Sequence, residues 1–397
     1  MERIAIIGAG AAGCFCAAQL RRMLPDARID VYEAGKKALS KVAVTGGGRC
    51  NLTNTFEGIR SLGEVYPRGE RLLRRLFHTF SHEDTLRWFE QAGVPMCIQD
   101  DHCVFPASQD ALQIVRTLLR EMEGSRIHLQ EKITRIEPGW TLQAQDGTLH
   151  EADRVVVTTG GAPKGLPMLE GLGLEWMPTV PSLFSFTVRD EGLRALMGIV
   201  VEASVSIPGT AFKADGPLLI TDWGLSGPAV LKLSSYAARY LAEAGYHAPL
   251  SVRWLDADES EIRTMLADLG ETHPQKCVSN TPPEGLQARL WAYLTTRAGL
   301  RADLRWAELG TKGRNRLTAV LTQDTYPVTG KNRFKEEFVT CGGVALSNID
   351  PATLECRKHP GLYFAGEVLD IDAITGGFNL QAAWTTGYAV AKAIATL

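Results

Sequence analysis

A glycine-rich motif close to the N-terminus is the clearest chemical feature of this sequence. Gly8, Gly10 and Gly13 form a G-x-G-x-x-G, and Glu33 follows 20 residues after the last of them. Glycines at this spacing let the backbone approach a pyrophosphate, and an acid at this distance accepts hydrogen bonds from a ribose 2′-OH. Such an acid favours the free 2′-OH of FAD or NAD over the 2′-phosphate of NADP. The motif therefore predicts a dinucleotide-binding site.

The elements around this motif have the order that such a site needs. The apolar run Ile4–Ile7 is typical of a buried parallel strand, a helical stretch extends from about Ala12 to Leu24, and Ile29–Tyr32 forms a second strand. The helix N-terminus offers unpaired N–H groups and the positive end of its dipole to phosphates. A βαβ unit explains this complete order better than a glycine-rich turn in another kind of α/β protein.

A second glycine-rich segment, TGGGRCN, covers Thr45–Asn51. Three consecutive glycines cost backbone entropy, so they make sense where the chain presses against a flat group or adopts positive φ. Two interpretations stay open, a contact with the ring face of a cofactor and an ordinary surface turn. Arg49 could bind a carboxylate, stabilise cofactor charge or pack beside a pyrophosphate. Cys50 is interpreted as a small buried residue rather than a nucleophile.

Glycine-rich turns also follow predicted strands later in the chain. The strand Arg154–Thr158 leads into Thr158–Gly161, and a strand ending in Ala365–Glu367 precedes Thr375–Gly377 and a long C-terminal helix. In a doubly wound sheet, turns at the carboxyl ends of the strands lie on the ligand side. We therefore expect the turn at Thr158–Gly161 to lie on the ligand side of the sheet.

Composition narrows the class of protein. The chain has 397 residues, of which 45% are hydrophobic and 22% charged, with a net charge of −3. This net charge supplies no global attraction to nucleic acid or to an anionic membrane, so we expect neither as a partner. No apolar run reaches transmembrane length, and the N-terminus enters a strand without a signal peptide, so we expect a cytoplasmic protein.

Other reactive side chains have simpler explanations than a functional site. Eight cysteines are scattered without a C-x-x-C pair or zinc spacing, which favours reduced thiols and no metal. His78 and His82 are four residues apart, but a predicted helix cap at Ser81 separates them, so a shared metal is not expected. The four arginines between Arg68 and Arg75 are interpreted as a solvated helix face rather than an RNA site.

Longer motifs spread over the chain carry a family resemblance. They are TGGGRCNLTN (45–54), GLSGPAVL (224–231), FKEEFVTCGGV (334–344) and GLYFAGEVLDIDAITGGFNLQAAWTTGY (361–388). With these motifs the chain resembles the YhiN/BaiN-type flavoprotein family, which includes aminoacetone oxidase and a reductase-like member from bile-acid metabolism. The N-terminal, middle and C-terminal pieces together resemble the FAD-binding domain of glutathione-reductase-like flavoproteins.

The resemblance implies an α/β fold in which a discontinuous FAD-binding Rossmann domain carries insertions. Residues 1–165 and 336–397 would form the FAD-binding domain. Residues 178–256 and 323–335 would form an inserted β-barrel-like substrate domain, and residues 257–322 a small helical subdomain. The sequence pattern agrees, because a proline-rich linker is followed first by strand-like and then by helical stretches.

The resemblance also implies which residues bind FAD. The ADP part would lie on the N-terminal motif and Glu33, with the adenine edge near Ile133, and the flavin ring would lie against Gly46–Asn51. Glu367 would meet the ribityl–phosphate end, and the start of the C-terminal helix the pyrimidine end. The full set of expected FAD-binding residues is Gly8, Gly10, Ala11, Ala12, Gly13, Glu33, Ala34, Lys41, Gly46, Gly47, Gly48, Arg49, Cys50, Asn51, Ile133, Thr159, Gly160, Gly366, Glu367, Gly376, Gly377, Asn379 and Leu380.

Asp222 and Arg49 are the candidate catalytic residues. Many family members have His where this chain has Asp222, in ITDWGLSGP. If that position faces the substrate, the substrate preference of the His-bearing relatives does not carry over. If it only caps the turn, Asp would serve equally well. His102 lies in a polar stretch and is interpreted as exposed.

The expected function is that of an FAD-dependent oxidoreductase acting on a small metabolite. Hydride transfer at flavin N5 would oxidise an amine or reduce a C=C bond. No second G-x-G-x-x-G follows Gly13, so NAD(P)H would act as a transient reductant without a domain of its own. The alternatives are a flavin-dependent RNA-modifying protein and a redox-sensing flavoprotein. The sequence makes no prediction about the oligomeric state.

Overall fold

The chain forms two compact units, which are described separately. The computed structural model describes residues 1–162, 165–332 and 339–396, so the first part of the motif FKEEFVTCGGV (334–344) lies outside the described residues. The first unit comprises Met1–Val180 and Val339–Leu397, and the second comprises Pro181–Phe338. The first unit is therefore discontinuous in sequence. The domain limits expected from the family stay a prediction.

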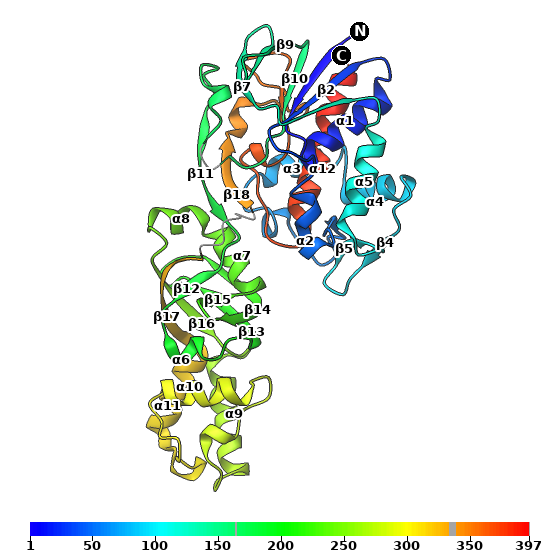
Figure 1. Ribbon diagram of the computed structural model, residues 1–397. Helices are drawn as coiled ribbons and strands as arrows, with labels where there is room; N and C mark the ends of the chain where they lie inside the picture. The colour runs from blue at the N-terminus through cyan, green and yellow to red at the C-terminus, as the bar shows by residue number, and fades with distance from the viewer. Residues whose placement is uncertain (163–164, 333–338, 397) are drawn as a thin grey trace. The chain divides into compact units, whose positions relative to one another are not determined.

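A five-stranded parallel sheet is the centre of the first unit (Figure 1). Its strand order is β19-β10-β1-β2-β6, and all neighbouring strands are parallel. The strands are β1 (Arg3–Ile7), β2 (Arg28–Glu33), β6 (Arg126–Leu129), β10 (Arg154–Val157) and β19 (Leu362–Phe364). Because the strands are parallel, the carboxyl ends of β1, β2, β10 and β19 meet at one edge of the sheet. The glycine-rich segments of the sequence follow three of these ends.

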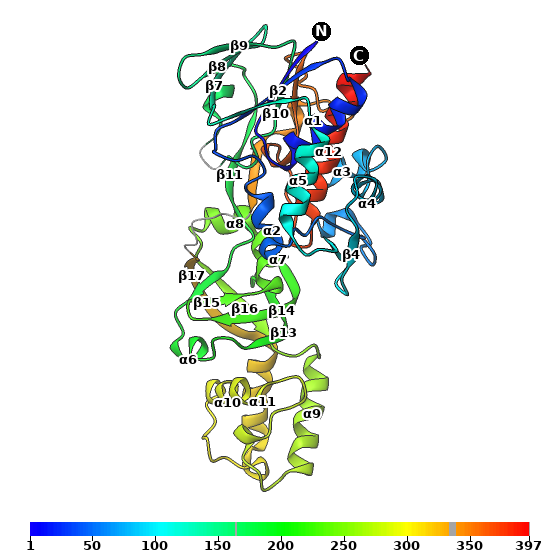
Figure 2. The ribbon, with the colours of Figure 1, turned by 45° about the vertical axis from the view of Figure 1, so that its right-hand side comes forward.

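Helices α1 (Ala11–Met23) and α12 (Phe378–Ala395) lie side by side in Figures 1 and 2. They approach closely because Gly387 has no side chain, and a Cβ there would lie 2.8 Å from the carbonyl oxygen of Ala12. Phe15 of α1 packs against Trp384 of α12 with ring centroids 5.3 Å apart. Burial of such aromatic rings contributes strongly to packing. The two ends of the chain are thus joined in one core.

Smaller elements complete the first unit. Helix α5 (Ala111–Glu121) packs against α1. Two further helices are α3 (Glu70–Leu76) and α4 (His82–Gln91). The cap predicted at Ser81 starts α4, where Ser81 and Asp84 form a capping box. The remaining strands are β3 (Thr53–Asn54), β4 (Met96–Ile98), β5 (Cys103–Pro106), β7 (Ile133–Glu137), β8 (Thr141–Ala144), β9 (Leu149–Glu151), β11 (Trp176–Ser182) and β18 (Val339–Val344).

The second unit is a closed six-stranded barrel with helices attached to it. The barrel order is β12 (Phe186–Val188), β15 (Gly224–Ser226), β14 (Lys213–Thr221), β13 (Val200–Ser206), β16 (Ala248–Arg253) and β17 (Asp324–Lys331). Its helices include α7 (Pro228–Tyr236), α8 (Ala238–Glu243), α9 (Glu259–Thr272), α10 (Ala288–Arg297) and α11 (Gly310–Gln323). Barrel and helices share one hydrophobic core, which contains the buried Trp254 and Trp291. The expected fold class, a Rossmann domain with an inserted barrel and helices, is confirmed.

None of the helices in the described part of the chain combines the length and the apolar character needed to cross a bilayer.

A buried ion pair fixes the segment that precedes α12. Arg68 Nε lies 2.5 Å from Asp372 Oδ1, and a second guanidinium nitrogen contacts the other carboxylate oxygen. The Asp372 side chain is fully buried, and that of Arg68 is 11% exposed. Nearby, Ile374 N–H donates to the carbonyl oxygen of Val65 at 3.0 Å. These contacts hold the chain immediately before Gly376.

Arg68→Gln should destabilise the fold strongly, because it removes the guanidinium group that pairs with the buried Asp372 carboxylate. We expect a loss of about 3–5 kcal/mol in the free energy of unfolding, measured by urea denaturation. The matched control is Arg116→Gln, which breaks the exposed pair with Asp110 and should change stability by less than about 1 kcal/mol. Equal effects of the two substitutions would contradict this role for the buried pair.

Candidate functional site

Gly8 and Gly13 are required by the packing of the first βα turn. Gly8 has φ 110°, and a Cβ there would lie 2.5 Å from the carbonyl oxygen of Thr158. A Cβ on Gly13 would lie only 2.0 Å from the carbonyl oxygen of Gly8. Thr158 Oγ1 closes the turn by donating to Gly8 O at 2.8 Å. These two glycines therefore serve the close approach of β1, α1 and β10.

Gly10 faces open space. A Cβ at this position would meet no atom within 4 Å, and the backbone φ of −86° suits any residue. Neither packing nor backbone conformation within the protein therefore requires glycine here. Gly10 is also the N-cap of α1 and gives no side-chain hydrogen bond, and the first turn of α1 has no acidic residue. The N–H groups at the start of a helix need partners from outside the helix, and a phosphate is a suitable one. The turn thus fits the pyrophosphate of a dinucleotide.

Glu33 lies at the end of β2, against this turn. Its Oε2 accepts a hydrogen bond from Ala9 N–H at 2.9 Å, and its Oε1 accepts one from Gly35 N–H at 2.7 Å. A carboxylate with two such donors still has lone pairs for a ribose hydroxyl. Glu131 N–H donates to the carbonyl oxygen of Glu33 at 2.9 Å, which brings the buried Ile133 close to the same strand end.

The segment Gly46–Gly48 adopts the left-handed conformations that only glycine takes readily. The φ values are 57°, 68° and 85°, and a Cβ on Gly47 or Gly48 would meet nothing within 4 Å. This bare backbone fits a flat ring system. Arg49 is exposed, donates from Nε to Gly46 O at 3.2 Å, and lies 4.5 Å from the centre of the Phe105 ring. Arg49 therefore stabilises its own loop.

The thiol of Cys50 is unsuited to nucleophilic chemistry. Its side chain is buried, and burial raises the pKa of this thiol to about 12. The thiolate, which is the reactive form, is therefore scarce near neutral pH. The structure agrees with the interpretation of Cys50 as a small buried residue.

The ends of β10 and β19 bring three further expected residues together. Glu367 Oε1 accepts a hydrogen bond from Thr340 N–H at 2.7 Å, and Lys41 Nζ lies 3.8 Å from Glu367 Oε2. A Cβ on Gly160 would lie 3.5 Å from the same carboxylate. Lys41, Gly160 and Glu367 are distant in sequence, yet they meet at the edge of the sheet that also carries Gly10.

The start of α12 is tied to the second glycine-rich segment. Asn51, in the amide orientation that satisfies both groups, donates to Thr53 O at 3.0 Å and accepts from Gly377 N–H at 3.3 Å. Gly377 is the N-cap with φ 87° and provides no side-chain cap. The N–H groups of the first turn, which includes Leu380, are thus available to a carbonyl oxygen of a ligand.

The side chain of Asn379 has a different task from the one its position suggests. Its Oδ1 accepts from Ala373 N–H at 2.9 Å, and its Nδ2 donates to Ala373 O at 3.0 Å. The side-chain amide therefore holds the preceding loop. Only the backbone of Asn379 is left for the contact with the flavin pyrimidine end that the family resemblance implies. Tyr66 adds a second support, since its hydroxyl donates to Phe378 O at 2.9 Å.

Asp222 belongs to the second unit and does not cap its own turn. The turn between β14 and β15 is closed by Thr221, whose hydroxyl accepts from Gly224 N–H at 3.1 Å and donates to Gly224 O at 3.0 Å. The Asp222 side chain is exposed, while its carbonyl oxygen accepts a hydrogen bond from Arg194. His102 is a loop residue with φ 63°, and its Nδ1 lies 3.6 Å from Glu57 Oε2.

The sequence analysis did not identify the residues that hold the loop before α12 and the start of that helix. Arg68, Asp372 and Tyr66 fix the loop before α12, and Asn54 Nδ2 donates to Gly376 O at 3.2 Å. Asn54 and Asp372 lie inside the motifs that carry the family resemblance, which was the available signal. Arg68 and Tyr66 gave no such signal, because their partners are distant in sequence.

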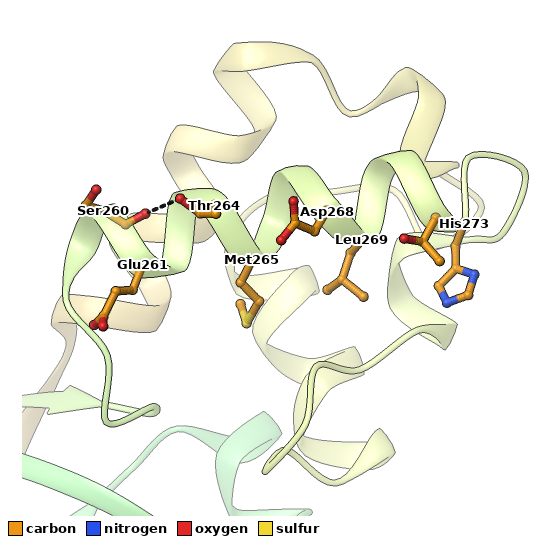
Figure 3. Close-up of a pocket in the computed structure, with 8 residues that line it drawn as sticks. Ser260, Glu261, Thr264, Met265, Asp268, Leu269 and His273 are labelled. Carbon is orange, nitrogen blue, oxygen red and sulfur yellow. Dashed lines mark hydrogen bonds between the residues drawn. The ribbon is translucent and has the colours of Figure 1, made fainter.

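A hollow on α9 is not a comparable site. It has a volume of about 520 Å³ and lies along one face of the helix, where Met265, Leu269 and His273 are among the side chains that project (Figure 3). It contains none of the residues expected to bind a cofactor. No group of His, Cys, Asp or Glu in the described residues could hold a metal ion.

Comparison with known proteins gives concordant results. The family described as "HI0933-like protein Rossmann domain" matches residues 2–393. The chain is 30% identical over 411 residues to a ribosomal RNA dihydrouridine synthase of Escherichia coli, covering 99% of this chain and 98% of that protein. It is 29% identical over 419 residues to a 3-dehydro-bile acid delta(4,6)-reductase of Clostridium scindens, covering 100% and 99%.

Similarity to solved structures supports the fold alone. The FrdA chain of E. coli quinol fumarate reductase matches with a TM-score of 0.51 at 16% identity, covering 100% of this chain and 70% of that one. The family match and the two relatives confirm the resemblance stated from the sequence motifs.

Gly10→Val and Gly13→Ala should separate cofactor binding from folding. A side chain at Gly10 enters the open space expected to hold the pyrophosphate, so FAD content should fall while the stability of the FAD-free protein changes by no more than about 0.5 kcal/mol. A Cβ at Gly13 meets Gly8 O, so the second variant should lose about 1–3 kcal/mol of stability even without FAD. Visible absorbance and urea denaturation measure the two effects. Full FAD content in Gly10→Val would contradict the assignment.

Asn379→Leu should loosen the loop before α12, because two hydrogen bonds to Ala373 are lost. Each such bond contributes about 0.5–1.5 kcal/mol, so we expect a roughly tenfold rise in the FAD dissociation constant or a lower flavin midpoint potential. Equilibrium dialysis and a redox titration would measure these quantities. If both stay at the wild-type values, the loop does not position the cofactor.

Proposed function

Because the chain belongs to the HI0933-like family of FAD-binding Rossmann proteins, we propose that it is an FAD-dependent reductase of a C=C bond conjugated to a carbonyl group. Its first candidate substrate is a uracil ring in RNA. The proposal rests on the type of reaction that the names of two relatives have in common, and each of these relatives matches over almost its full length. Dihydrouridine forms by reduction of the uracil C=C bond next to a carbonyl group, and a delta(4,6)-reductase of a 3-dehydro bile acid acts on C=C bonds conjugated to a ketone.

The residues of the first unit support a reductase of this kind. Bound FAD, once reduced by two electrons from a donor such as NAD(P)H, would supply a hydride to the β-carbon of the conjugated system. Gly10 and the start of α1 would hold the pyrophosphate, Glu33 the ribose, and Gly46–Gly48 would leave room for the ring. The uncapped start of α12 would favour the negative charge of the reduced ring, an effect of about 0.3–1 kcal/mol for a helix end and up to ~2 kcal/mol when partly buried.

The substrate needs a cation for the carbonyl oxygen and a proton for the α-carbon. We propose Arg49 for the first task, because its guanidinium is exposed beside the glycine segment and held there by Gly46 and Phe105. We propose water for the second task, because an exposed carboxylate such as that of Asp222 has no proton of its own to donate. Arg49 is a catalytic candidate named from the sequence, and binding of a carbonyl oxygen is the role that we add for it.

RNA enters this proposal although the net charge of −3 argued against a nucleic-acid partner. Net charge describes the average field of a protein, whereas binding of a single-stranded segment needs only a local group of cations and aromatic rings. The relative of 30% identity is named for an RNA substrate, and the match covers 98% of that protein. That name outweighs the argument from net charge.

The experiment is an anaerobic reoxidation of the reduced protein. The holoprotein is reduced with dithionite and mixed with a uridine-containing RNA oligomer or with a 3-oxo-4,6-diene steroid. We expect the RNA to restore the absorbance of oxidised flavin and to gain two hydrogens at uridine, detected by mass spectrometry. A parallel sample of oxidised protein receives aminoacetone. Flavin bleaching by aminoacetone, without reoxidation by either unsaturated acceptor, would show an amine oxidase and overturn the proposal.

A further inference from the structure

A second hollow lies within the first unit, beside the segment that holds α12. It has a volume of about 400 Å³, which is within the usual range for small-ligand sites. Its walls come from the loop after β3, from α3 with the residues that follow it, and from the first residue of α4. The lining residues are Phe56, Ile59, Arg60, Ser61, Leu62, Arg74, Phe77, His78 and His82.

The hollow has an aromatic wall. The Phe56 ring lies edge-on to Phe77 with centroids 5.4 Å apart, and its centre is 4.9 Å from that of the His82 ring. Phe56 and Phe77 are half-buried, so part of each ring is accessible. Rings presented in this way are platforms on which nucleobases stack.

His82 adds a polar atom that has no protein partner. Its Nδ1 is shielded from solvent and makes no hydrogen bond among the described residues. Burial lowers the pKa of His82, so its imidazole is neutral near pH 7. Burial of a polar atom without a partner costs free energy, and a ligand that offers a donor or acceptor here would recover part of that cost.

Cations line the rim of the same hollow. Arg60 is exposed and makes no ion pair within the described residues, while Arg74 pairs with Glu70. His78, four residues after Arg74, is also exposed. A guanidinium group binds phosphate through two parallel hydrogen bonds, which makes Arg60 suited to a phosphate.

The position of Phe56 is enforced by the loop that reaches the expected flavin site. Its backbone is left-handed, with φ 60°, and its N–H donates to Asn54 Oδ1 at 2.9 Å. The same Asn54 side chain donates to Gly376 O, and the Phe56 ring lies 5.1 Å from the Phe378 ring at the start of α12. Such conformations in residues other than glycine cost free energy and are concentrated at functional sites.

We propose that this hollow binds a nucleoside phosphate, with the base against Phe56 and the phosphate on Arg60. The inference rests on the proposed function, since an RNA substrate would supply such a unit next to the uridine that is reduced. A nicotinamide dinucleotide acting as the reductant has the same chemistry. A purely apolar ligand would leave Arg60 and the buried nitrogen of His82 unused.

Isothermal titration of the oxidised holoprotein tests the proposal without turnover. The probes are UMP, a short oligouridylate and adenosine 2′,5′-bisphosphate, which represents the phosphate-bearing half of NADPH. The variants are Phe56→Leu and Arg60→Gln, and Arg71→Gln, an exposed arginine of α3 outside the hollow, is the matched control. FAD content reports whether each variant is folded.

We expect Phe56→Leu to weaken binding by about 5- to 150-fold, since stacking of a base is worth ~1–3 kcal/mol. Arg60→Gln should weaken it and should lower the salt dependence of oligouridylate binding by about one phosphate contact. Arg71→Gln should match wild type. Preference for UMP and oligouridylate would identify RNA as the source, and preference for the bisphosphate would identify the nicotinamide reductant.

Two results would overturn the proposal: no binding of any probe, or binding that both hollow variants leave unchanged. Failure of the proposed function would give a different experimental result. In that case UMP or oligouridylate would bind through Phe56 and Arg60, but the uridine-containing RNA would not reoxidise the reduced protein.

Discussion

The site depends on the close approach of backbones at one edge of the parallel sheet. Gly8 lies against Thr158, Gly13 against Gly8, and Gly387 of α12 against Ala12 of α1, at distances that no Cβ would allow. These contacts bring the N-terminal, middle and C-terminal segments of the first unit together. A larger side chain at these positions would separate the segments, because a well-packed interior does not absorb additional atoms without strain.

Two helices then begin at this assembled edge without the usual side-chain caps. α1 starts at Gly10 and α12 at Gly377, and neither has an acidic residue in its first turn. Such helix ends leave N–H groups and a positive dipole unsatisfied, which a dinucleotide with anionic and carbonyl oxygens can satisfy. The supporting contacts lie on the protein side. Arg68, Asp372 and Asn379 use their side chains to hold the loop, so the backbone can face the ligand.

Local sequence patterns predicted the parts of this site that depend on local geometry. The βαβ order, the acid at Glu33 and the positive φ values of Gly46–Gly48 all follow from spacing and residue type. Tertiary partners could not be predicted in the same way. The stripe containing Arg68 was interpreted as a solvated helix face, yet this arginine forms a buried ion pair with Asp372, and Asn379 turns back to Ala373. The net charge, which is a sum over the whole chain, likewise gave no information about the local arrangement of Phe56 and Arg60.

The central claim is that the first unit of this chain holds FAD, and native mass spectrometry of the purified protein tests it most directly. The account predicts one population whose mass exceeds that of the chain by one FAD, and release of FAD on denaturation, identified by chromatography. A protein that carries no flavin after reconstitution with FAD, or that retains FMN instead, would contradict the account, because the Gly10 turn and Glu33 would then have no ligand to bind.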